Sequence, residues 1–172
     1  MIYFTPKRYV RLQSGDTAIA EAAEKEWEQA EANYLAYFQA NRHRLPPSVQ
    51  TLHDQVLLHD ALVLGMWSQE TEGSAAGTFT ILLQPETPTN QVVQLTYQLL
   101  AEPQMVEDAL PAEYRSSAMV WLYDEFDEEF GPGTFTHRIL FSSGEQLTLR
   151  ARDLHVARGS AIYLPSGSHK VA

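Results

Sequence analysis

Residues 120–156, VWLYDEFDEEFGPGTFTHRILFSSGEQLTLRARDLHV, decide the fold of this chain. Three segments of alternating apolar and polar residues follow one another here, separated by two turn signals. Two glycines and Pro132 interrupt the alternation in the first turn, residues 128–133. Gly144 supplies a left-handed backbone angle in the second turn, residues 142–145. This pattern predicts a three-stranded antiparallel meander.

Strict alternation assigns the side chains of the meander to two faces. In the middle strand His137 shares its face with three apolar residues, which predicts a histidine packed in the core or at its edge. The opposite face collects charged residues, and solvated cross-strand pairs there contribute roughly a few tenths of a kcal/mol each. In the first strand the two predicted faces are Val120, Leu122, Asp124 and Phe126 on one side, and Trp121, Tyr123, Glu125 and Asp127 on the other.

Two short helices are predicted near the N-terminus. Thr5 followed by Pro6 has the form of an N-cap and a first helical residue, so a helix is predicted over residues 6–13. Ser48 has the side chain of an N-cap for a second short helix over residues 49–56. Both segments are too short to be stable without tertiary packing.

The longest predicted helix covers residues 17–44, with Asp16 or Thr17 as its N-cap. Its acidic residues lie mainly outside one apolar stripe, so the stripe is predicted to face the core. The members of this stripe are Ile19, Ala23, Trp27, Ala30, Tyr34, Tyr37 and Phe38.

Three further strand signals lie in the middle of the chain, at residues 61–67, 78–83 and 91–100. The connections at residues 68–77 and 85–90 are too short for a crossover helix, so these strands are predicted to form a second antiparallel meander. Residues 101–117 lack a sustained period and are predicted to be a mobile loop with one helical turn at residues 106–110.

These elements predict a single α+β domain. Helices in residues 1–56, one of them long, pack on a mostly antiparallel sheet of about six strands in residues 57–164. The sheet is predicted to curl into a half-barrel or to split into two sheets. Its last part is a short edge strand at residues 161–164, and residues 165–172 are predicted to be a flexible tail.

Composition bounds the function classes. The 172 residues carry a formal net charge of −10, which opposes nonspecific binding to nucleic acid or to an anionic membrane and favours a basic protein partner. There is no cysteine, so thiolate zinc sites and cysteine nucleophiles are excluded. With no run of 18 apolar residues and no signal-peptide pattern, a cytoplasmic protein without a cofactor is expected.

The near-repeat Leu-His-Asp contains the candidate metal ligands. His53 and Asp54 recur six residues later as His59 and Asp60, and imidazole and carboxylate groups bind divalent metals. The two pairs fall on different predicted elements, however, and six residues on one helix would turn them apart. A structural role for these pairs is therefore favoured over a metal site, with His137 or Glu125 as further ligands in the metal alternative.

Catalytic and ligand-binding candidates are fewer. Glu125, His137 and Tyr123 form the best catalytic hypothesis, because a hairpin can bring a carboxylate beside an imidazole. The face assignment opposes it, since His137 is predicted to point away from Glu125. No serine-nucleophile, phosphate-loop or dinucleotide motif is present. A pocket between the sheet and the long helix is the alternative, lined by Trp27, Tyr34, Trp67 and Trp121.

Four short motifs resemble families of uncharacterised bacterial proteins: YFTPKRY at residues 3–9, LLHDALV at 57–63, WLYDEFD at 121–127 and FTHRILFSSGEQLTL at 135–149. These families combine an N-terminal helical segment with an LHDA strand and a hairpin of the form H-x-I-x-F-S-x-G-x-x-L. More distantly, the chain resembles antiparallel-sheet immunity proteins of bacterial toxin systems. Neither resemblance carries a catalytic residue onto this sequence. The missing catalytic constellation together with the acidic surface predicts a non-catalytic protein-binding role, immunity-like or regulatory.

Overall fold

The C-terminal meander forms as the alternation predicts. The computed structural model describes residues 1–70, 77–88, 90–128 and 131–160. Strands β5 (Trp121–Asp127), β6 (Phe135–Phe141) and β7 (Gln146–Ser160) pair antiparallel in sequence order. Gly144, at φ 104°, makes the β6–β7 turn, and an added Cβ there would lie 2.8 Å from the Arg115 side chain. Only glycine fits this position without strain.

The second meander also forms, from β1 (Leu62–Gln69), β2 (Thr78–Gln84) and β3 (Gln91–Leu99). Strand β7 joins the two meanders, because its second half pairs with β3 from Leu99↔Ala151 to Gln91↔Ser160. Within the described residues the strand order is β1-β2-β3-β7-β6-β5. The α+β class, with helices packed on an antiparallel sheet, is therefore confirmed.

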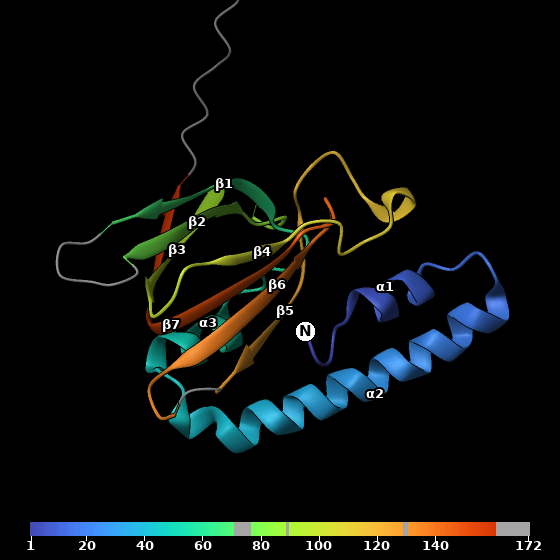
Figure 1. Cartoon of the computed structure of the whole chain (residues 1–172), viewed down its shortest axis with the longest axis horizontal. Coiled ribbons are helices and arrows are strands. Elements are labelled where there is room, and N and C mark those ends of the chain that lie inside the picture. Colours follow the sequence, from blue (N-terminus) through green and yellow to red (C-terminus); the bar gives the residue numbers. More distant parts are fainter. Residues whose placement is uncertain (71–76, 89, 129–130, 161–172) are drawn as a thin grey trace, which may run out of the picture.

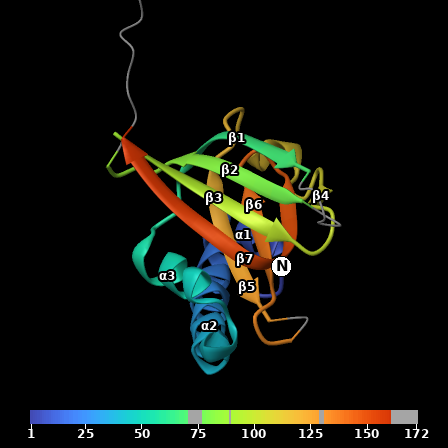
Figure 2. The ribbon, with the colours of Figure 1, turned by 90° about the vertical axis from the view of Figure 1, so that its left-hand side faces the viewer.

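The sheet curls into a half-barrel (Figure 2). Its first and last strands approach each other at one end, where Leu62 and Val120 form an isolated antiparallel bridge. Backbone hydrogen bonds flank the bridge, from Asp60 N–H to the Trp121 carbonyl and from Val63 N–H to the Met119 carbonyl, both at 2.9 Å. The backbone is therefore paired at this end of the gap between β1 and β5.

The helices are α1 (Pro6–Leu12), α2 (Thr17–Asn41) and α3 (Pro47–Gln55), with a 3-10 turn η1 (Arg42–Arg44) continuing α2. Thr5 and Asp16 cap α1 and α2 as predicted. The predicted Ser48 cap is wrong, because α3 begins two residues earlier than predicted, at Pro47, with Pro46 as its N-cap. Figure 1 shows α2 crossing below the sheet, beside the N-terminal segment and α1.

One apolar core lies between α2, α3 and the concave face of the sheet. Side chains with almost no exposed surface come from both layers, including Phe38 and Leu52 from the helices and Leu95, Ile139 and Leu147 from the strands. The α2 stripe is buried at Ala23, Ala30, Tyr34 and Phe38, whereas Ile19 is exposed near the start of the helix. None of the helices in the described part of the chain is long and apolar enough to cross a membrane.

Residues 101–117 differ from the sequence prediction. A three-residue strand, β4 (Gln104–Val106), pairs with the first half of β7. The helical turn lies at η2 (Ala112–Tyr114) instead of residues 106–110. The predicted edge strand at residues 161–164 and the tail at 165–172 lie outside the described residues, as do parts of the loops at 68–77, 85–90 and 128–133.

A β-bulge at the start of β5 changes the predicted faces. Trp121 pairs with Phe141 and Tyr123 pairs with Leu140, so Leu122 is an extra residue in the ladder. Trp121 consequently faces the interior together with Asp124, and Leu122 packs on the outer face with Leu140. The assignment of Trp121 and Leu122 by strict alternation is therefore wrong.

Candidate functional site

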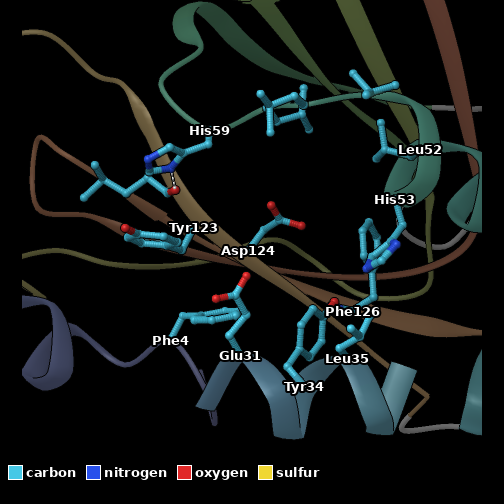
Figure 3. Close-up of a pocket in the computed structure, with 14 residues that line it drawn as sticks. Phe4, Glu31, Tyr34, Leu35, Leu52, His53, His59, Tyr123, Asp124 and Phe126 are labelled. Atoms are coloured by element: carbon cyan, nitrogen blue, oxygen red, sulfur yellow. Dashed lines mark hydrogen bonds between the residues drawn. The ribbon is translucent and has the colours of Figure 1, made fainter. Parts of the chain in front are cut away.

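A pocket of about 510 Å³ lies between α2, α3 and β5 (Figure 3). The segment between α3 and β1 closes one side, and Phe4 from the N-terminal segment closes another. The lining residues are Phe4, Glu31, Tyr34, Leu35, Leu52, His53, Val56, Leu57, Leu58, His59, Leu122, Tyr123, Asp124 and Phe126. Ligand sites in proteins are typically concave spaces of roughly this size, about 300–1,000 Å³.

Asp124 carries the carboxylate of the pocket floor. Trp121 Nε1–H donates to Asp124 Oδ1 at 2.9 Å, and His137 Nε2 lies 3.0 Å from Asp124 Oδ2. About 27% of the Asp124 side chain remains accessible, and Figure 3 shows its carboxylate pointing into the pocket. A carboxylate oxygen can accept two hydrogen bonds, so each oxygen retains acceptor capacity for a ligand.

Behind Asp124, a buried hydrogen-bond chain fixes the carboxylate. His137 has no exposed surface, and its Nδ1 lies 2.9 Å from the Tyr97 hydroxyl. With Tyr97 O–H donating to Nδ1 and Nε2–H donating to Asp124, every polar atom of the chain has a partner. Burial, followed by the negative charge of Asp124, raises the pKa of Tyr97 and keeps its hydroxyl neutral. The Phe126 ring stacks on the His137 imidazole, with ring centroids 3.8 Å apart, and this contact restricts rotation of the imidazole.

The surroundings of Asp124 favour its charged form. Burial alone raises the pKa of this carboxyl, but the hydrogen bond and electrostatic interaction with His137 and the bond from Trp121 outweigh it. The net effect lowers the pKa of Asp124 below its ordinary value. The pocket therefore presents a preorganised carboxylate at neutral pH.

Aromatic and leucine side chains make the rest of the wall. Tyr34 is buried, and its hydroxyl accepts the Phe126 N–H at 2.8 Å, while burial raises its pKa. The Tyr123 ring stacks on Phe4, with ring centroids 5.7 Å apart, and meets the Trp27 ring at a tilt, with centroids 4.4 Å apart. At the mouth, Leu35 is 49% exposed and Leu57 is 82% exposed. The pocket thus joins an apolar wall to an open apolar rim.

The two predicted His-Asp pairs lie at separate places on this wall. The His53 ring stacks on Phe38 at 3.7 Å. His59 Nδ1 donates to the Leu122 carbonyl, and its Nε2 is 3.4 Å from Asp60 Oδ2. Figure 3 places His53 and His59 at opposite sides of the cavity.

Asp54, the fourth candidate metal ligand, pairs with Arg42. Across the described residues, no group of three or more His, Asp or Glu side chains is arranged to hold a metal ion. The structure therefore does not gather the four candidate ligands around one point.

The catalytic hypothesis combined residues of β5 and β6 that point to opposite faces of the sheet. Glu125 is only 2% exposed, and its carboxylate accepts the backbone N–H groups of Ile2, Tyr3 and Phe4 at 2.6–2.7 Å. His137 lies on the concave face, as its alternation predicts. The structure thus separates Glu125 from His137 and gives His137 the partner Asp124 instead.

The aromatic candidates divide into three groups. Tyr34 lines the pocket, and Trp27 packs behind it against Tyr123. Trp121 lies behind the floor as a donor to Asp124, whereas Trp67 is exposed on β1 away from the pocket. Asp124 was missed as a site residue, although its place on an otherwise apolar face of the first strand is the signal for a buried functional carboxylate.

Comparisons with known proteins add no family. No protein-family model matches this chain, and a search of curated proteins found no match. The functional interpretation therefore depends on the pocket and its chemistry.

Proposed function

We propose that this chain is a non-catalytic binding protein and that the pocket between α2, α3 and β5 is its ligand site. The observation that carries the proposal is the Asp124 carboxylate, which two internal donors fix in place while part of it stays open to the cavity. An ionised group is costly to bury unless it is paired, so the remaining acceptor capacity supports a role in binding.

The chemistry of the walls favours binding over catalysis. The described lining residues include no serine, threonine or lysine, and the chain has no cysteine. These are common nucleophiles of covalent catalysis, and the carboxylate of the pocket floor, Asp124, is itself held by Trp121 and His137. A fixed carboxylate surrounded by aromatic and leucine side chains is typical of recognition of a partly apolar ligand with one polar group.

The test is a nuclear magnetic resonance titration of the whole chain with a library of small aromatic fragments, neutral and charged. At least one fragment is expected to shift the backbone amides of His59, Tyr123 and Asp124 together. The variant Leu35→Trp, which fills the mouth from an exposed position, should weaken that fragment. The proposal is overturned if no fragment shifts these amides, or if Leu35→Trp has no effect.

A protein partner is the second candidate, favoured by the exposed Leu35 and Leu57 at the mouth. Exposed apolar side chains beside an acidic pocket suit a basic segment of another protein, as an immunity-like or regulatory role requires. Pull-down from the native host at low and high salt, with the wild type and Leu57→Glu, tests this role. It is contradicted if both forms retain the same proteins.

A further inference from the structure

The charge of the pocket is negative. Its described lining residues include the acids Glu31 and Asp124 and no lysine or arginine. Figure 3 shows both carboxylates directed into the same part of the cavity, one from α2 and one from β5. Two acidic groups in one partly enclosed space repel an anionic ligand and attract a cationic one.

The hydrogen-bond state of Asp124 specifies a donor. Trp121 donates one hydrogen bond to Oδ1, and His137 donates one to Oδ2. Each oxygen therefore keeps one free acceptor position. The positions left over can only accept. A ligand group that completes this carboxylate must therefore bring N–H or O–H hydrogens, and a charged N–H forms the stronger bond.

The aromatic walls suit the same ligand. Phe4, Tyr34 and Tyr123 surround the space next to Glu31 and Asp124, and ring faces attract an ammonium group. Leucine side chains, including Leu52, Leu57 and Leu58, offer an apolar surface for the rest of the molecule. The pocket thus has a cationic end and an apolar end.

Building on the proposed function, we infer that the pocket binds an organic ammonium ion: a primary amine, protonated at neutral pH, on an aromatic or branched aliphatic body. The ammonium group donates to Asp124, with Glu31 supplying a second negative charge. The apolar body lies against the tyrosine and leucine walls and reaches toward Leu35 at the mouth.

Three probes of matched shape test the charge requirement: phenethylammonium, phenethyl alcohol and phenylacetate. Dissociation constants are measured by resonance titration at about pH 8, where histidine side chains are ordinarily neutral. Phenethylammonium is expected to bind about tenfold more tightly than the alcohol, because its donor is charged while the alcohol offers the same carboxylate a neutral donor, and phenylacetate is expected to bind the least tightly. The inference is overturned if the alcohol or phenylacetate equals or exceeds the ammonium probe.

Variants then assign the preference to residues. Asp124→Asn should reduce the roughly tenfold preference for the ammonium probe to about threefold, the part that Glu31 still supplies, while changing affinity for the alcohol by less than about twofold. Because Asp124 also supports the fold, the exposed Glu31→Gln provides a second test, with an expected loss of about threefold for the ammonium probe only. Glu24→Gln, an exposed α2 residue outside the pocket lining, is the matched control and should change nothing.

The outcomes separate the two proposals. Equal binding of the ammonium and alcohol probes at the pocket amides contradicts the ammonium inference and leaves the pocket supported as a binding site. Absence of binding by all three probes contradicts the ammonium inference, whereas the pocket fails as a binding site only if no fragment of the library shifts the same amides. Unchanged ammonium affinity in Asp124→Asn and Glu31→Gln overturns the assignment to these carboxylates.

Discussion

Strand β5 carries two neighbouring carboxylates with opposite environments. Asp124 faces the concave side and the pocket, whereas Glu125 faces the convex side and the N-terminal segment. Glu125 is 2% exposed and holds three backbone N–H groups, but the Asp124 side chain is about 27% accessible and is held by two side chains. The same charge, one residue apart, therefore serves two purposes.

The environments of Glu125 and Asp124 differ in which groups donate hydrogen bonds to the carboxylate. The backbone N–H groups of residues 2–4 donate to the Glu125 carboxylate and so bind the N-terminal segment to β5. The donors to Asp124 come from behind the strand, through Trp121 and the His137–Tyr97 pair, so the front of the carboxylate stays available. Acceptor capacity left open toward a cavity, more than burial, distinguishes a binding carboxylate from a structural one.

Removing Glu125 should give the largest effect. Glu125→Ala leaves three N–H groups without their charged acceptor, and each such loss costs about 1–3 kcal/mol. Because the N–H groups of Ile2 and Tyr3 are only partly buried, the expected fall in the free energy of unfolding lies in the lower part of the summed range, roughly 3–6 kcal/mol, out of a typical total of about 5–15 kcal/mol. Urea unfolding measures it, and hydrogen exchange at Tyr3 and Phe4 should accelerate.

Glu24→Ala on the exposed side of α2 is the control, with an expected change within about 0.5 kcal/mol. If Glu125→Ala unfolds at the same urea concentration as this control, Glu125 does not anchor the N-terminal segment. Glu125 would then have no larger structural role than an exposed carboxylate.

Asp124→Asn should have the next largest effect, because one of its two internal donors loses its acceptor, at a cost of about 1–3 kcal/mol. The loss should also depend on pH. The folded-state pKa of Asp124 is lowered, so the unfolded chain binds more protons at acidic pH and stability rises with pH. The contribution is complete above the unfolded value, near 3.9, and is lost as pH falls through the folded pKa.

Urea unfolding of the wild type and Asp124→Asn between about pH 2 and pH 6 measures this difference. The two curves should differ by a constant amount well above about pH 4 and should converge as the pH falls below that value, through the lowered folded pKa of Asp124. A constant separation across this range would show that the Asp124 charge does not stabilise the fold.

The sequence predicts most of the fold because the relevant forces are local. Alternation predicts the strands of both meanders, and the Thr5 and Asp16 caps mark two helix starts. The bulge at Leu122 was missed, since an inserted residue keeps the apolar pattern while reversing the faces. The extension of β7 to Ser160 was also missed, because its partner β3 lies about 60 residues earlier in the chain.

The site was harder to predict for the same reason. Alternation correctly separates His137 from Glu125, and the pocket does lie between the sheet and the aromatic helix with Tyr34 on its wall. The partners of Glu125 are backbone N–H groups more than 120 residues away in the sequence. Because every residue except proline has such a group, the sequence pattern could not identify them. Asp124 among apolar neighbours was visible in the sequence, but its donors depend on tertiary contacts.

Tyr97→Phe tests the hydrogen bond between Tyr97 and His137 behind Asp124, and it should lower the free energy of unfolding by less than Asp124→Asn does. Loss of the hydroxyl leaves Nδ1 of the buried His137 without a partner, which costs about 1–2 kcal/mol while the ring still fills its place. Nitrogen chemical shifts of the His137 imidazole should change with it. Tyr114→Phe, on the partly exposed turn η2, is the control; equal stability of both variants would contradict a fixed Tyr97–His137–Asp124 chain.

The smallest effect is expected at a third β5 carboxylate, Asp127, where the Tyr37 hydroxyl donates from α2. Burial, followed by this hydrogen bond, raises the pKa of Tyr37 to about 12. The unfolded chain then loses its tyrosine proton first, so the contribution is complete below about pH 10 and is lost as pH rises toward the folded value.

Tyr37→Phe should lower the free energy of unfolding by only about 0.5–1 kcal/mol near neutral pH, since the bond is partly exposed to solvent. Ultraviolet titration should show the loss of one late-titrating tyrosine in this variant. If the tyrosine titration is unchanged, the hydroxyl is not held by Asp127. Asp127 would then keep only its ion pair with Arg138, at 3.3 Å.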